Sequence, residues 1–162
     1  MTYQPDILIY GIGNPGRNDD GCGIVCVEEM GHWLATQGIR NVHCETNYQL
    51  NIEDAEMISG FDMVVFVDAT IEPIKDIRYT AVDPSGSRIE FTMHAISPSF
   101  VLDLCSKLFG TVPDTYLLQI KGVEWAFREE LSETGIQNVK KAVNLLKRIA
   151  LKPHITYCMP EF

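Results

Sequence analysis

A glycine-rich turn between a strongly apolar run and a helix constrains this chain more than any other feature. Residues 7–10 are branched or aromatic, and such a continuous run is typical of a strand buried on both faces of a sheet. Residues 11–16 then interrupt the chain with three glycines and a proline, because glycine adopts backbone angles that other residues avoid and proline excludes helix. From Gly21 onward, apolar residues recur at helical spacing, and Gly38 ends this pattern. This order of strand, turn and helix predicts the first unit of an α/β fold.

The rest of the chain continues the alternation. Further strands are predicted at residues 41–45, 62–68, 77–82, 88–92 and 116–120, and helices at residues 52–58, 97–110 and 132–150. The tight turn at residues 83–86 predicts an antiparallel edge in an otherwise parallel sheet. No linker or repeat divides the 162 residues, so we expect a single domain over residues 1–162.

Composition limits the partners and the compartment. With 13 Lys and Arg against 22 Asp and Glu, the net charge of -9 argues against nucleic acid or an anionic membrane as the partner. A secretory signal is not recognisable, and the apolar runs are too short to span a bilayer, so we expect a cytoplasmic protein. Five cysteines without a CxxC pair fit a reduced compartment. We expect Cys22 and Cys26 to pack in the core.

Asp19 and Asp20 stand at the predicted start of the first helix, where the helix dipole stabilises ionised carboxylates. Three interpretations are open. The GxGxxG string of residues 11–16 matches a dinucleotide-binding fingerprint, with Glu45 as the ribose acid, but the two aspartates stand where the pyrophosphate would bind. Either aspartate alone would cap the helix. In the third interpretation, a carboxylate faces a site at the carboxyl edge of the sheet.

Two further residues could complete such a site. Asp68 ends the apolar run of residues 63–67, and His94 precedes Ser97-Pro98, a strong helix start. Near a helix N-terminus an imidazole is favoured in its neutral form, which metal binding or base catalysis requires. With Asp20, these residues provide two carboxylates and one imidazole, a set suited to nickel or zinc. GxSxG, HExxH and aspartic-protease motifs do not occur in the sequence.

These motifs together resemble the hydrogenase maturation endopeptidases, which trim the C-terminus of the large subunit of nickel-iron hydrogenases. The resemblance rests on residues 11–14 and 19–23, on Val67-Asp68-Ala69, and on His94 ahead of Ser97-Pro98, and it covers nearly the whole chain. It implies an α/β fold of the phosphorylase/hydrolase-like kind, a three-layer α/β/α sandwich with a mostly parallel, mixed five-stranded sheet.

The resemblance also implies two sets of site residues. The metal-ligating and catalytic set is Asp20, Asp68 and His94. The set that binds the substrate is Gly11, Gly13, Asn14 and Asp19, and Asp19 is also the alternative metal ligand.

The implied metal is nickel, and it is carried by the precursor of the hydrogenase large subunit. The enzyme would complete the coordination of that nickel and hydrolyse a peptide bond near it, with Asp20 or Asp68 as base. Another divalent ion, such as cadmium or zinc, could occupy the same ligands. The expected enzyme is a monomer with no nucleic acid or membrane partner.

The chain departs from the commonest family pattern in two places. Many members have glutamate where Asp20 stands, so the carboxylate here is one methylene shorter. Residues 15–17 and 45–51 also differ and look more like the subgroup that serves soluble, cofactor-linked hydrogenases. Two other functions remain open: a checkpoint that binds the nickel-loaded precursor without cutting it, and a small nucleotide-binding domain.

Overall fold

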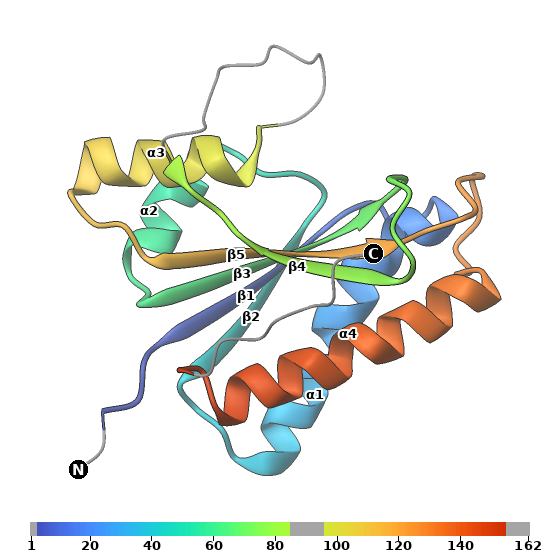
Figure 1. Ribbon diagram of the computed structural model, residues 1–162, viewed down its shortest axis with the longest axis horizontal. Coiled ribbons are helices and arrows are strands. Elements are labelled where there is room, and N and C mark those ends of the chain that lie inside the picture. The colour runs from blue at the N-terminus through green and yellow to red at the C-terminus, as the bar shows by residue number, and fades with distance from the viewer. Residues whose placement is uncertain (1–2, 85–95, 155–162) are drawn as a thin grey trace.

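The computed structural model describes residues 3–84 and 96–154, and its strands form one mixed sheet (Figure 1). The sheet order is β2-β1-β3-β5-β4. The strands are β1 (Ile7–Ile12), β2 (Val42–Asn47), β3 (Met63–Thr70), β4 (Ile77–Ala81) and β5 (Asp114–Lys121). The helices are the 3-10 helix η1 (Asn18–Gly21) and the α-helices α1 (Cys22–Gln37), α2 (Asp54–Ser59), α3 (Pro98–Phe109) and α4 (Glu133–Leu151).

The strand directions confirm the predicted α/β class and its mostly parallel, mixed five-stranded sheet. Strands β1, β2, β3 and β5 are parallel, and β4 pairs antiparallel with β5 at the edge. The antiparallel edge expected for residues 77–82 is therefore present, whereas the strand predicted at residues 88–92 lies outside the described residues. Because the four parallel strands point the same way, their carboxyl ends meet at one edge of the sheet.

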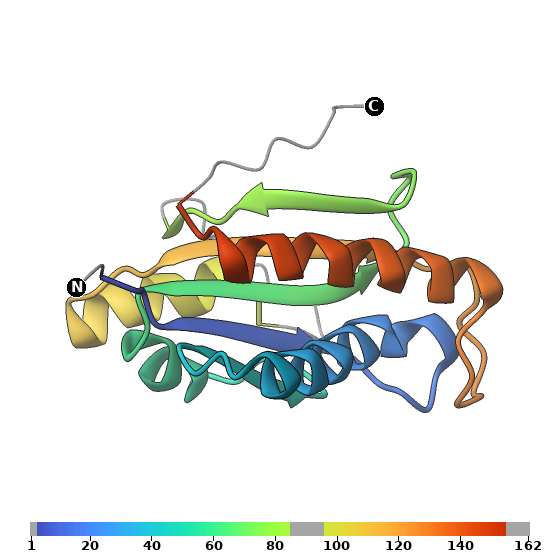
Figure 2. The same ribbon diagram turned by 90° about the horizontal axis from the view of Figure 1, so that it is seen from below.

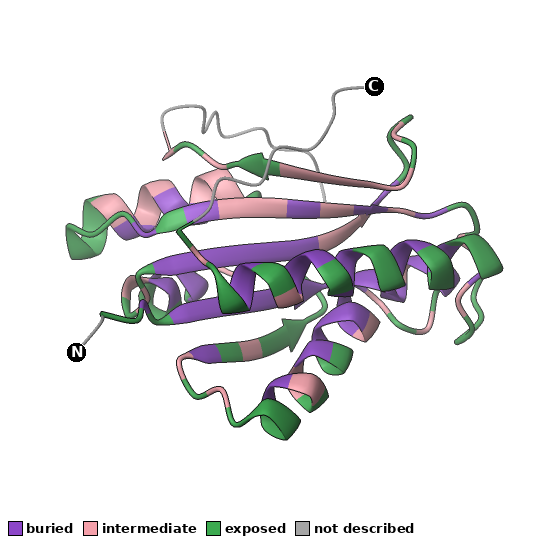
Figure 3. Ribbon diagram, turned by 60° about the horizontal axis from the view of Figure 1, so that its bottom comes forward, coloured by how far each residue is buried: buried purple, intermediate pink, exposed green. Residues whose placement is uncertain are grey.

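Two apolar cores, one on each face of the sheet, give the molecule three layers (Figure 2). Alternate residues of β1 and β3 point to opposite faces. Ile9 and Val65 pack under α1 and α4, while Leu8 and Phe66 pack under α2 and α3. On α1 and α4, buried residues alternate with exposed ones along the helix, as expected for amphipathic helices that cover a sheet (Figure 3). The three-layer α/β/α sandwich expected from the resemblance is confirmed.

The helices begin and end where the sequence predicts. The hydroxyl of Ser97 accepts a hydrogen bond from the amide of Phe100 at the start of α3, and Ser132 caps α4 in the same way. Gly38 and Gly110 end α1 and α3 with positive φ angles of 66° and 70°. Among the described residues, no helix is long and apolar enough to cross a membrane.

The first turn of α1 lies directly on the ends of β1 and β3. A Cβ atom at Gly23 would lie 2.5 Å from the carbonyl oxygen of Val67 and 2.7 Å from that of Ile12. A Cβ atom at Gly11 would lie 2.7 Å from the carbonyl oxygen of Gly23. These glycines therefore let the helix contact the strand ends, and this contact fixes the turn that carries Asp20 at the carboxyl edge of the sheet.

Three details of the prediction were wrong. Asp68 is not the last residue of its strand, because β3 continues pairing with β5 through Thr70. Helical spacing also puts Leu108 and Ile136 on the apolar faces predicted for residues 97–110 and 132–150, but their side chains are 66% and 45% exposed. They lie in the last turn of α3 and the first turn of α4, where the sheet no longer covers the helix.

Candidate active site

Asp20 and Asp68 come together at the carboxyl edge of the sheet. Asp68 follows Val67, which pairs with Gly11 on β1, and Asp20 lies in η1 just beyond β1. Burial, together with the nearby charge of Asp20, raises the pKa of Asp68 to about 7, and the amide of Ala69 offsets only part of this rise. Among the described residues, no side chain donates a hydrogen bond to the Asp68 carboxylate and no cation pairs with it. The pair is therefore a concentration of negative charge that no cation of the described residues neutralises.

Asp20 is held by the turn that precedes it. Its Oδ2 atom accepts a hydrogen bond of 3.1 Å from the amide of Asn14. The side chain of Asn14 accepts a bond of 2.9 Å from the amide of Gly16, which closes the turn. Gly13 has a φ angle of 143°, and a Cβ atom there would lie 2.0 Å from the carbonyl oxygen of Asp20. The glycines and Asn14 thus shape the support of Asp20, and their contact with substrate stays a prediction.

Asp19 faces away from Asp20, into the connection between β5 and α4. It is 0% exposed and accepts hydrogen bonds from the amides of Val123, Glu124 and Ser132 and from the hydroxyl of Ser132, at 2.7–3.0 Å. Burial acts to raise the pKa of Asp19, but these donors outweigh it, so the pKa is lowered. Contact between Asp19 and a substrate, expected from the sequence, would require this arrangement to open.

Neither aspartate caps α1. The residue at the cap position is Gly21, and no side chain bonds there. The capping interpretation of the acidic pair was therefore wrong for α1. Asp19 accepts hydrogen bonds from the connection between β5 and α4, and Asp20 accepts one from the turn before η1.

His94 lies outside the described residues, in the connection between β4 and α3. The described parts of the chain contain no cluster of three or more His, Cys, Asp or Glu side chains that could hold a metal. Two of the three expected ligands, Asp20 and Asp68, are brought together, and the contribution of His94 stays a prediction.

A polar network beside Asp68 was not foreseen from the sequence. Gln119 on β5 is the strand partner of Asp68, and Arg78 on β4 is the partner of Gln119. Arg78 donates to the side-chain oxygen of Gln119 from two nitrogens, at 2.9 Å and 2.6 Å, and also pairs with Glu72. The signal in the sequence was Gln119 itself, a polar residue within the apolar strand of residues 116–120.

A buried cysteine next to the acidic pair is not a candidate nucleophile. Cys22 is 0% exposed. Burial and the charges of Asp19 and Asp20 raise its pKa to about 12, so its thiol stays protonated at neutral pH. As predicted, Cys22 and Cys26 belong to the core under α1 and α4.

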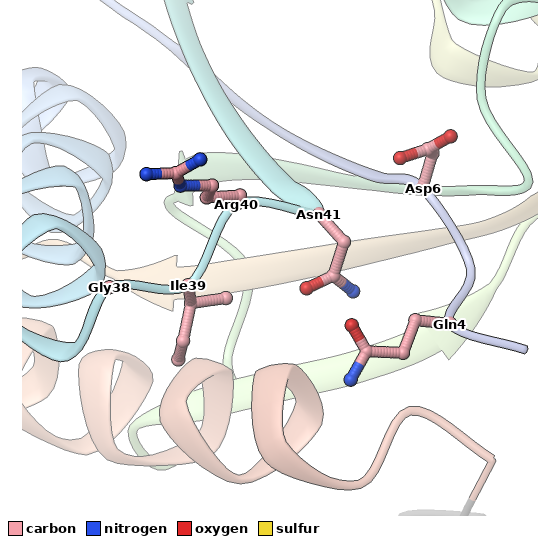
Figure 4. Close-up of a pocket in the computed structure, with 6 residues that line it drawn as sticks. All are labelled: Gln4, Asp6, Gly38, Ile39, Arg40 and Asn41. Carbon is pink, nitrogen blue, oxygen red and sulfur yellow. The ribbon is translucent and has the colours of Figure 1, made fainter. Parts of the chain in front are cut away.

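The described residues also form a hollow of about 430 Å³ at the opposite edge of the sheet (Figure 4). It lies beside the amino ends of β1 and β2 and is lined by Gln4, Asp6, Gly38, Ile39, Arg40 and Asn41. Ligands of open α/β sheets bind at the carboxyl ends of the strands. We therefore place the candidate site at Asp20 and Asp68 and not in this hollow.

The raised pKa of Asp68 predicts a pH-dependent stability. The unfolded pKa is about 3.9, so the folded state binds the proton more tightly, and stability is lost as the pH rises from about 4 to about 7. Three pH units correspond to on the order of 4 kcal/mol. We expect Asp68→Asn to be as stable as the wild type near pH 4 and more stable at pH 8, in urea denaturation of the free protein. An equal stability at pH 8 would show that Asp68 is not destabilised by its surroundings.

Comparison with known proteins places this fold among proteases of one kind. No family model and no curated protein matches the sequence. The NiFe hydrogenase maturation protease HycI from Thermococcus kodakarensis KOD1 is similar in structure, with a TM-score of 0.72, 22% identity, and coverage of 91% of this chain and 94% of that one. The hydrogenase maturating endopeptidase HybD from E. coli gives a TM-score of 0.70 at 18% identity, over 91% and 93% of the two chains.

A hydrogenase 2 maturation peptidase from a Thaumarchaeota archaeon gives a TM-score of 0.64 at 20% identity, over 90% and 97% of the chains. At these identities the comparison shows a shared fold. The chain therefore has the fold of the hydrogenase maturation proteases over nearly its whole length.

Proposed function

We propose that this protein is an endopeptidase that removes the C-terminal extension of a nickel-loaded hydrogenase large-subunit precursor. The observation that carries the proposal is the pair of Asp20 and Asp68, two carboxylates with no ion pair among the described residues, at the carboxyl edge of a sheet whose fold is that of maturation proteases. We further propose that it acts in the cytosol, because five cysteines without a CxxC pair fit a reduced compartment, and that it is a monomer. Its net charge of -9 argues against nucleic acid or an anionic membrane as partner.

The acidic pair suits a substrate that brings its own divalent cation. Burial and mutual repulsion disfavour the ionised form of Asp68, and a cation between the two carboxylates would reverse that penalty. Carboxylate and imidazole ligands suit nickel. In this proposal Asp20 and Asp68 contact the nickel of the precursor, and His94 adds its imidazole from the β4–α3 connection.

Hydrolysis then needs a base for water and an acid for the leaving amine. We propose Asp68 as this base, because a carboxylate beside the nickel can accept the proton of the attacking water. Its pKa of about 7 applies to the protein without a cation, and the nickel would lower it. The base takes a proton from water as the water oxygen attacks the scissile carbonyl, and the proton then goes to the amine as the C–N bond breaks. Asp20 is the alternative base. Nickel polarises the carbonyl or positions the water.

Two other functions use the same structure differently. A checkpoint would bind the nickel-loaded precursor through the same residues without cutting it. A nucleotide-binding domain would place a pyrophosphate at the turn of residues 13–21, where the carbonyl of Asp20 fills the space beside Gly13 and two carboxylates repel phosphate. The structure gives no specific observation in favour of either.

The intact mass of the precursor, after incubation with this protein, distinguishes these functions. We expect loss of a C-terminal peptide from the nickel-loaded precursor and no change in the nickel-free one. Binding without a mass change would support the checkpoint instead. If the precursor is neither bound nor cleaved, the hydrogenase large subunit is not the substrate of this protein.

A further inference from the structure

The connection between β5 and α4, residues 123–131, is held rigidly by the turn that precedes α1. We call it the acidic loop. The backbone amide of Asn18 donates to the carbonyl of Arg128, and its side chain donates to the carbonyl of Glu130, both at 2.6 Å. The amide of Asp19 donates to the carbonyl of Glu124 at 3.1 Å. The carboxylate of Asp19 accepts from the other side, from the amides of Val123 and Glu124. The backbone of the acidic loop is therefore fixed although most of its side chains, apart from Trp125 and Leu131, face solvent.

One side chain of the acidic loop is unusually bare. Phe127 is 87% exposed, the largest exposed fraction among the large apolar side chains of the described chain. The guanidinium of Arg17 lies over its ring, 5.8 Å from the ring centre, and Arg17 also donates to the carbonyl of Trp125 at 3.0 Å. A rigid backbone thus presents an aromatic ring to water, which forfeits the gain of burying it. Aromatic side chains on rigid supports are typical anchors of protein interfaces.

The charge around Phe127 is negative on balance. Glu124, Glu129, Glu130 and Glu133 are exposed, against two arginines, Arg128 in the same segment and Arg17 over the ring. None of the four carboxylates forms an ion pair with a residue that the structure describes. A partner that covers Phe127 would meet these carboxylates, so a basic segment is complementary to this surface.

The acidic loop borders the candidate active site. The amide of Gly122, the residue before the loop, donates to the carbonyl of Thr70, two residues beyond Asp68. The loop is also hydrogen-bonded to Asp19, the residue before Asp20. The loop and the turn before α1 lie side by side at the carboxyl edge of the sheet (Figure 2). A protein whose peptide enters the candidate site would therefore pass over this loop.

We infer that the acidic loop is a docking surface for the protein substrate, with Phe127 as the anchor and its glutamates binding a basic segment of that substrate. The inference rests on the proposed function for its choice of partner. It adds a contact outside the catalytic pair, which would set affinity and not the rate of the chemical step.

The test is a kinetic comparison on purified nickel-loaded large-subunit precursor. We expect Phe127→Ala to raise KM about tenfold with kcat nearly unchanged, because only ground-state binding is removed. A double variant, Glu129→Gln with Glu130→Gln, should raise KM and weaken its dependence on salt concentration. Phe127→Tyr should restore the KM of the wild type.

The matched control is Leu108→Ala, which removes an exposed apolar side chain at the far end of α3. It should leave both constants unchanged. If the wild type cleaves the precursor and Phe127→Ala cleaves it with the same KM, the docking inference is wrong and the proposed function is unaffected. A wild type that neither binds nor cleaves the precursor would overturn both.

Discussion

Asp68→Asn is expected to lower cleavage of the nickel-loaded precursor at least a hundredfold, since general base catalysis contributes about 10²–10⁴ in rate. The amide has nearly the same shape as the carboxylate but cannot take a proton or carry the charge that binds nickel. The measurement is the initial rate of peptide release, followed by intact mass.

A fall in activity through unfolding is separable from this effect. Because the amide of Ala69 offsets only part of the cost of burying the Asp68 carboxylate, Asp68→Asn should unfold at a higher urea concentration than the wild type at pH 8. Asp114→Asn makes the same substitution at the exposed start of β5, at the opposite edge of the sheet, and should keep full activity. Cleavage at the rate of the wild type by Asp68→Asn would show that Asp68 is not part of the catalytic machinery.

Asp19→Ala is expected to destabilise the protein by about 3 kcal/mol or more, because each buried donor left unpaired costs about 1–3 kcal/mol. These donors are the backbone amides of residues 123, 124 and 132 and the hydroxyl of Ser132, which all donate hydrogen bonds to the Asp19 carboxylate. Urea denaturation measures the loss. Since the folded pKa of Asp19 is lowered, its contribution is present above about pH 4 and is lost as the pH falls through the folded value. The gap between wild type and variant should therefore narrow in acid.

The neighbouring aspartate provides the control. Asp20 accepts one backbone hydrogen bond and is partly exposed, so Asp20→Asn should change stability little. Equal destabilisation by Asp20→Asn and Asp19→Ala would contradict the different structural roles assigned to the two carboxylates.

The regular parts of the fold were predictable because local chemistry determines them. Apolar runs identified the central strands, and Ser97, Ser132 and Gly38 marked helix ends through bonds within a few residues of each. The convergence of Asp20 and Asp68 followed from parallel strands ending at one edge.

The different roles of Asp19 and Asp20 were not predictable, because the partners of Asp19 lie more than 100 residues away in sequence. A weak signal was present in Gly122 and Gly135. A Cβ atom at either would lie within 3 Å of Asp19, at 2.8 Å and 2.4 Å. A glycine in the first turn of α4 lowers helix propensity, and the space it leaves for Asp19 explains it.

The nickel K-edge X-ray absorption spectrum of the loaded precursor, with and without this protein, tests the central claim most directly. If Asp20 and Asp68 contact the nickel of the substrate, adding the wild type adds oxygen ligands to the nickel, and Asp68→Asn adds fewer. Identical spectra with and without the wild type, in a mixture that still releases the C-terminal peptide, would contradict nickel recognition by the acidic pair.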